Sequence, residues 1–199
     1  MKNAYFLCFI LLISFSVTAQ SGFEVKGYFG MSGALVNWNE NLDGASSVDI
    51  ERFKEVGVLL SKSISDKLSL SGGLNYSFAI VEFNPPNCFD CSPENTFYAH
   101  NQDFSMLSIP ISAEYSLGKI FYVSAGPVLD VQLSEGNNFS DQSGVGYLVG
   151  LGAKLDTERF FFSIFPNYKR HNVIPFEKEG NYKQLMQELG VQLGVGYSF

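Results

Sequence analysis

The chain contains little charge, only two histidines and only three cysteines among its 199 residues. Charged residues make up 17%, below the ~25% typical of soluble proteins. Basic residues number 13 against 20 acidic ones, and this balance disfavours nucleic-acid binding, which needs a basic face. Beyond the N-terminal segment, no apolar run approaches the roughly 18 residues that a membrane-spanning helix requires. A nucleic-acid-binding protein and a helical membrane protein are therefore both disfavoured.

The N-terminal segment has the pattern of a secretory signal peptide. A Met-Lys start precedes an apolar run over residues 4–17, which ends in Val-Thr-Ala, a small-residue cleavage pattern. We therefore expect residues 1–19 to be removed and residues 20–199 to form one domain. Cleavage also removes Cys8 and one lysine, which leaves 12 basic residues against 20 acidic ones and changes the net charge from −7 to −8. An exported chain does not fit a cytoplasmic enzyme.

After the signal peptide, apolar and polar residues alternate over eight segments. Leu107, Ile109 and Ile111, for example, are separated by serine and proline. A period of two places successive side chains on opposite faces, which predicts strands and not helices. The segments are 23–35, 52–64, 68–83, 104–117, 120–133, 144–155, 159–170 and 185–199.

The connections between these segments are alternately short and long. The short ones are 65–67, 118–119 and 156–158, and the long ones are 36–51, 84–103, 134–143 and 171–184. An up-and-down meander has tight turns at one end and long loops at the other, and eight such strands close into a barrel without free edges. We expect an all-β, eight-stranded antiparallel barrel with both termini and the short turns in the periplasm and four extracellular loops.

The polar face of the segments indicates whether water or lipid surrounds the barrel. In a soluble, lipocalin-like barrel the apolar face points inward, whereas in a transmembrane barrel it points toward lipid. Here the polar face is rich in glycine and serine with isolated charges of both signs, which suits a narrow lumen better than a water-facing exterior. We therefore predict a transmembrane barrel with a charge network in its lumen, formed by Glu24, Lys26, Glu55, Glu114, Asp130, Lys154, Arg159, Lys169 and Glu188. A soluble periplasmic barrel that binds a small ligand is the alternative.

Large side chains also fall on the predicted inner face. An eight-stranded barrel has an interior just wide enough to be filled by side chains. A wide diffusion pore is therefore not expected. The large inward residues are Tyr28, Phe161, Phe165 and Met186.

The chain ends on an alternating apolar strand that contains Tyr197 and Phe199. This ending resembles the C-terminal signal by which outer-membrane barrels are recognised for assembly. We therefore expect the barrel-assembly machinery to be a partner through the last strand.

One hairpin carries a family resemblance. The strand LSIPISAEY (107–115), followed by a tight turn and FYVSAGP (121–127), resembles the central hairpin of the PorT-like outer-membrane β-barrel family. The resemblance implies an eight-stranded barrel in the outer membrane of a Gram-negative bacterium. Some members of that family are linked to protein secretion and most have no assigned activity, so no functional residue is carried over.

Cys88 and Cys91 lie in the second long connection and are a disulfide candidate, because an exported compartment permits the bond. Free thiols are one alternative. A metal site that also uses His100 and Asp103 is another, although two cysteines alone would not complete a zinc site.

Two further groups are candidate binding residues. Lys169, Arg170 and His171 lie together at the outer end of the seventh segment, where they would meet glycolipid phosphates; an ordinary charged strand end is equally consistent with them. The first long connection contains an acidic stretch but lacks the spacing of an EF-hand, so a solvated loop is favoured over a calcium site. The stretch contains Trp38, Glu40, Asp43 and Asp49.

The function most consistent with these features is a structural, interaction or secretion-accessory role in the outer membrane. The expected partners are outer-membrane lipids and glycolipid, the assembly machinery, and secretion or envelope proteins; no cofactor, metal or nucleic acid is expected. An enzyme at the barrel rim that acts on lipid or peptide is an alternative, but only His100 and His171 are available as bases and neither lies in a recognisable motif.

Overall fold

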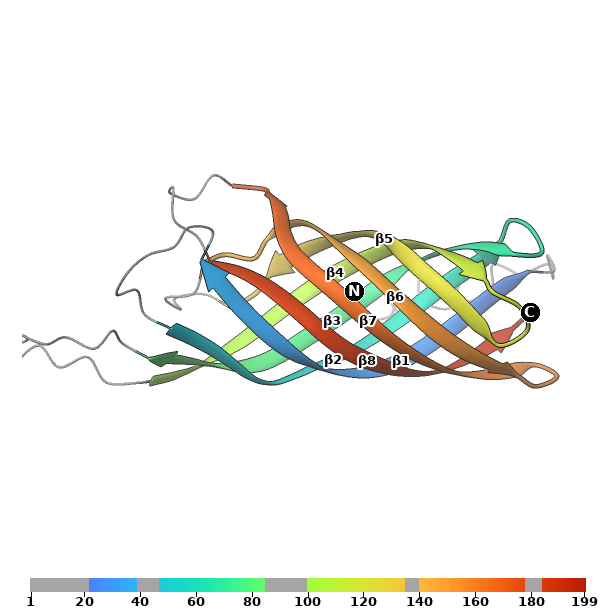
Figure 1. Cartoon of the computed structure of the whole chain (residues 1–199), viewed down its shortest axis with the longest axis horizontal. Coiled ribbons are helices and arrows are strands. Elements are labelled where there is room, and N and C mark those ends of the chain that lie inside the picture. The colour runs from blue at the N-terminus through green and yellow to red at the C-terminus, as the bar shows by residue number, and fades with distance from the viewer. Residues whose placement is uncertain (1–21, 39–46, 85–99, 135–139, 178–183) are drawn as a thin grey trace, which may run out of the picture.

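The computed structural model describes residues 22–38, 47–84, 100–134, 140–177 and 184–199. No helix in these ranges has the length and hydropathy needed to cross a membrane. Each strand pairs antiparallel with its neighbours in sequence, and β1 pairs with β8, so that the sheet closes into a barrel (Figure 1). The predicted eight-stranded antiparallel barrel is confirmed. Its strands are β1 Phe23–Trp38, β2 Ser47–Ser63, β3 Leu68–Asn84, β4 His100–Ser116, β5 Phe121–Gln132, β6 Gly144–Asp156, β7 Phe160–Pro175 and β8 Gln184–Ser198.

The closing ladder between β1 and β8 runs without a register shift from the pair Glu24–Ser198 to the pair Trp38–Gln184. A closed sheet satisfies the backbone N–H and C=O groups of the wall internally, as hydrocarbon requires. Tight turns join β2 to β3, β4 to β5 and β6 to β7 at one end of the barrel. In the second of these turns Gly118 has a φ of 117°, a conformation that favours glycine.

The strands extend beyond the predicted segments at the other, long-loop end. β1 continues to Trp38, and β7 continues to Pro175. His100 and Asp103 belong to β4, and Asp49 belongs to β2, so the prediction that these residues lie in loops is wrong. Beyond the apolar band of a membrane barrel, neither face of a strand needs to be hydrophobic, so the alternation of residue types ends before the hydrogen-bonded ladder does.

Two bulges interrupt the alternation near the long-loop end. Arg52 in β2 and Asn172 in β7 have positive φ angles of 53° and 49°, and the pairing register shifts beside each of them. Ile50 packs against the apolar cluster inside the barrel whereas Arg52, two residues later, is exposed, and His171 and Asn172 are both buried although they are adjacent. Extra residues in one strand, one in β2 and two in β7, redirect the side chains beside them, an effect that strict alternation does not predict.

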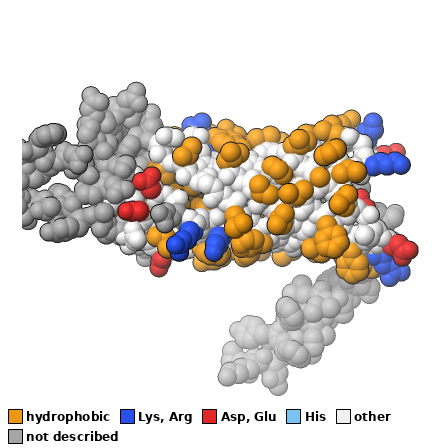
Figure 2. All heavy atoms as spheres, turned by 60° about the horizontal axis from the view of Figure 1, so that its bottom comes forward, with side chains coloured by type: hydrophobic (Ala, Val, Ile, Leu, Met, Phe, Trp, Pro, Cys, Tyr) orange, Lys and Arg blue, Asp and Glu red, His pale blue; other side chains and the backbone are white. Residues whose placement is uncertain are grey.

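Large apolar side chains cover the outside of the barrel between its two ends, and charged side chains lie toward the ends (Figure 2). Leu74 and Leu193 are each 56% exposed, whereas Glu55, Asp130 and Lys169 are 3%, 0% and 4% exposed. A transmembrane barrel has this polarity, with apolar residues toward lipid and polar residues toward the lumen. The predicted orientation of the wall is confirmed.

Candidate functional site

A buried charge network centred on Lys169 crosses the lumen. The ammonium of Lys169 lies 2.5 Å from a carboxylate oxygen of Glu55 and 3.4 Å from one of Glu188. Glu55 also accepts hydrogen bonds from the amides of Asn75, at 2.7 Å, and Gln192, at 3.0 Å. One cation therefore ties β7 to β2 and β8, and the other hydrogen bonds to Glu55 come from neutral amides.

His171 joins the same network from the bulge in β7. Its Nδ1 lies 2.8 Å from Asp130 and its Nε2 lies 2.7 Å from Glu188. Ionised carboxylates only accept hydrogen bonds, so the arrangement suits a ring in which both nitrogens carry a proton. Glu188 also accepts a hydrogen bond of 3.1 Å from Ser32. Three strands, β1, β7 and β8, thus meet at Glu188, and His171 links them to Asp130 of β5.

A second charged layer lies closer to the short-turn end. The Lys154 ammonium is 2.6 Å from Glu24 and 3.4 Å from Asp156, and it lies 4.2 Å from the ring centroid of Phe161. Glu114 accepts a hydrogen bond of 2.9 Å from Ser71. This layer lines a cavity of about 170 Å³, so its side chains are more accessible to solvent than those of the Lys169 network.

Aromatic side chains fill the lumen between the two layers. The ring of Tyr122 lies over Gly152 of the neighbouring strand: a Cβ at Gly152 would be 2.3 Å from Cζ of Tyr122. Tyr122 also stacks on Phe165, with the ring centroids 5.7 Å apart. The cavity beside them measures about 20 Å³, room for about one water. The inward orientation predicted for Tyr28, Phe161, Phe165 and Met186 is confirmed by their burial.

An apolar cluster fills the lumen at the long-loop end. Alternation predicted one of its members, Met186, to point inward; most of the others occupy polar-face positions of the predicted segments, and Val48 lies before the predicted start of β2. Gln142, which is fully buried, covers this cluster: it donates to the carbonyl of Gln184 at 2.9 Å and accepts from the amide of Met186 at 3.1 Å. The buried cluster consists of Val48, Phe53, Ala79, Val81, Phe83, Phe104, Met106 and Met186.

The structure corrects two predicted groups. Lys169 and His171 are buried ion-pair partners inside the lumen, so Lys169, Arg170 and His171 do not form a rim cluster for glycolipid phosphates. Alternation on β7 sends Arg170 to the other face of the wall from its two neighbours. Arg159, predicted in the lumen network, is exposed in the turn before β7 because the strand starts one residue later. His171 takes part in that network in its place.

The remaining predicted sites are only partly covered. Cys88, Cys91, Glu40 and Asp43 lie outside the described residues, so the disulfide stays a prediction. Among the residues that the structure does describe, no group of three His, Cys, Asp or Glu side chains is placed to hold a metal ion.

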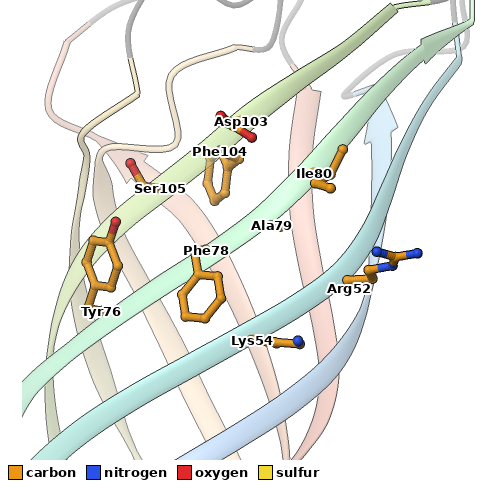
Figure 3. Close-up of a pocket in the computed structure, with 9 residues that line it drawn as sticks. All are labelled: Arg52, Lys54, Tyr76, Phe78, Ala79, Ile80, Asp103, Phe104 and Ser105. Atoms are coloured by element: carbon orange, nitrogen blue, oxygen red, sulfur yellow. The ribbon is translucent and has the colours of Figure 1, made fainter.

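A groove of about 500 Å³ lies on the outer wall near the long-loop end (Figure 3). The sequence carries a signal for it: Arg52 and Lys54 share the face of Val56 and Val58, so two cations interrupt the apolar outer face of β2 near its long-loop end. The groove is bordered by Arg52 and Lys54 of β2, Tyr76, Phe78 and Ile80 of β3, and Asp103 of β4.

The chain is similar in structure to outer-membrane proteins of known structure. Against OprG from Pseudomonas aeruginosa it is 16% identical over 90% of this chain and 96% of that chain, with a TM-score of 0.58. Against AlkL, solved in lipid bilayers, it is 14% identical over 90% of each chain, with a TM-score of 0.50. No family model and no curated protein matches the chain. At these identities the likeness establishes the fold: the chain is an eight-stranded antiparallel barrel of the kind found in small outer-membrane proteins.

Proposed function

We propose that the protein is an integral outer-membrane barrel of a Gram-negative bacterium, exported by its signal peptide, with a closed lumen and a structural or interaction role. The observation that carries this proposal is the buried network of Glu55, Lys169, Glu188, His171 and Asp130 inside an apolar-coated barrel. Such a lumen ties the wall together and leaves the loops and the rim as the surfaces that contact other molecules.

A closed lumen predicts little ion conduction. The charge network blocks the lumen nearer the long-loop end, and the stack of Tyr122 on Phe165 narrows it nearer the short-turn end. The cavity beside that stack measures about 20 Å³. Purified protein inserted into planar lipid bilayers should therefore show no stable open-channel current. A steady ohmic conductance of the folded protein would contradict the proposal.

Membrane insertion has its own test. Cell fractionation should place the protein in the outer-membrane fraction, and the folded barrel should migrate differently on a gel before and after boiling. A protein recovered in the periplasmic fraction without detergent would support the soluble-barrel alternative instead.

We also propose that the partners are envelope or secretion proteins; this part rests on the PorT-like resemblance of residues 107–127. A strain that lacks the gene, complemented with the wild-type chain or with a chain whose residues 85–99 are replaced by a glycine-serine linker, tests it. Loss of secretion in the deletion strain, restored by the wild-type chain and not by the linker variant, is the expected result. Unchanged secretion in the deletion strain would remove the secretion role and leave the barrel assignment intact.

His171 does not support a rim enzyme. Both of its ring nitrogens face carboxylates within 2.8 Å, and its side chain is buried, so it is not available to a substrate at the rim.

A further inference from the structure

The groove on the outer wall contains two cations that point toward the surroundings of the barrel and not toward the lumen. Arg52 is exposed, and it is redirected by the bulge that puts two residues of β2, Arg52 and Phe53, opposite the single residue Ala79 of β3. Its φ of 53° is unfavourable for an arginine, so the local structure holds this side chain outward at a cost in backbone energy. Bulges that redirect a side chain are often found at functional sites.

Lys54 lies within the apolar coat. Its neighbours across the two ladders are Met31 of β1, which is 59% exposed, and Phe78 of β3, which is 39% exposed. Among the described residues neither Lys54 nor Arg52 has a carboxylate within ion-pair distance. A cation on the lipid face of a barrel is destabilising unless its head reaches the interface or an anion there.

The groove beside these cations is apolar on its other side. Tyr76 and Phe78 stack with ring centroids 6.1 Å apart and are both partly exposed, and Ile80 continues this surface (Figure 3). Asp103 lies across β3 from the cations, where it pairs with Ile80 in the β3–β4 ladder. An anion is therefore favoured on the β2 side of the groove, and an apolar chain is favoured over β3.

We propose that this groove binds a phosphorylated glycolipid of the outer leaflet, with a phosphate on Arg52 and Lys54 and an acyl chain along Tyr76 and Phe78. The assignment rests on the proposed outer-membrane location, which places the long-loop end at the outer leaflet. A lipid fits better than a protein partner because the cations sit beside the lipid-facing apolar coat. Arginine and lysine together suit phosphate, since arginine offers paired donors and lysine a point charge.

The test uses purified mature protein in detergent micelles and native mass spectrometry to count bound lipid. The probes are bis-phosphorylated lipid A, fully dephosphorylated lipid A and phosphatidylglycerol. The variants are Arg52→Gln with Lys54→Gln, the charge-retaining Arg52→Lys, and Lys62→Gln as a matched control, because Lys62 is an exposed lysine of the same strand at the short-turn end. Heat-dependent gel mobility verifies that each variant is folded.

The expected result is that the wild-type chain prefers bis-phosphorylated lipid A over both other lipids. The double variant should lose about tenfold or more in affinity for it, since two charge-assisted contacts are removed. Lys62→Gln should bind nearly as the wild type does, and Arg52→Lys should lose less affinity than the double variant, because it keeps the charge but not the paired donors. Equal binding of dephosphorylated lipid A or of phosphatidylglycerol, an unchanged double variant, or an equal loss in Lys62→Gln would each overturn the site. None of these readouts depends on conduction or secretion, so failure of this inference is distinct from failure of the proposed function.

Discussion

The ammonium of Lys169 and the carboxylate of Glu55 meet 2.5 Å apart in the lumen, and both side chains are at most 5% exposed. The two residues are 114 positions apart in sequence and lie on β7 and β2, which are not adjacent in the sheet. The pair therefore joins two walls of the barrel that share no backbone hydrogen bonds.

Replacing Lys169 with methionine should destabilise the barrel by about 3–5 kcal/mol, because Glu55 would then be buried without a cation and Glu188 would keep only His171. Urea titration of the barrel folded into lipid vesicles measures this free energy of unfolding. Adding Glu55→Gln to Lys169→Met should recover part of the loss, since one buried charge is removed. Lys62→Met, on the outer face, is the control and should change stability little; a small effect of Lys169→Met itself would show that the lumen is well hydrated.

Gly152→Ala, which adds one methyl group, should destabilise the folded barrel by about 1–3 kcal/mol, the usual range for overpacking. Its Cβ would lie 2.3 Å from the ring of Tyr122, and that ring is held by its stack on Phe165. Gly27→Ala is the matched control, because a Cβ at Gly27 meets nothing within 4 Å. The same urea titration compares the two variants, and equal stabilities would mean that the aromatic layer rearranges freely.

Arg52→Gly should stabilise the barrel by about 1 kcal/mol in vesicles that contain only phosphatidylcholine, because glycine adopts a φ of 53° without the penalty of an L side chain. The same variant should bind bis-phosphorylated lipid A more weakly than the wild type does. A gain in stability together with a loss in binding would indicate that Arg52 contributes to lipid binding in the groove and not to the stability of the barrel. Destabilisation in phosphatidylcholine would indicate instead that the arginine side chain stabilises the wall.

Deleting Phe199 should reduce assembly in cells more than refolding in micelles. Structurally, Phe199 adds one ring contact to Tyr197, with centroids 5.1 Å apart, and one backbone hydrogen bond to Phe23, so its loss costs the folded barrel little. If the last residue is an assembly signal, outer-membrane levels of the variant should fall while its refolding yield stays near that of the wild type. A matching loss in both assays would assign Phe199 to stability alone.

The charged residues show how much of the lumen network the sequence predicts. Alternation placed Glu24, Glu55, Asp130, Lys154 and Glu188 in the lumen, where the structure pairs each of them. The period of two carries this information because it assigns a face to every residue of a regular strand.

The errors arose where strands are irregular or outlast the apolar pattern. The apolar alternation stops at Arg170 and so predicts His171 at the rim, whereas the β7 ladder continues and the alternation that buries Lys169 also buries His171; the bulge then buries the adjacent Asn172 as well. A bulge adds residues to one strand only, and its position depends on the partner strands, so a single chain pattern does not reveal it.

The sequence by itself determined that eight alternating strands form a barrel with apolar residues outside and small or charged residues inside, because side-chain direction in a strand follows from position alone. Only the tertiary structure decided which charges meet across the lumen, which glycines lie under aromatic rings and where Arg52 and Lys54 border a groove. Each of these relationships involves residues of different strands. Which residues face each other depends on the register of the strands, and that register is set by the closure of the whole sheet.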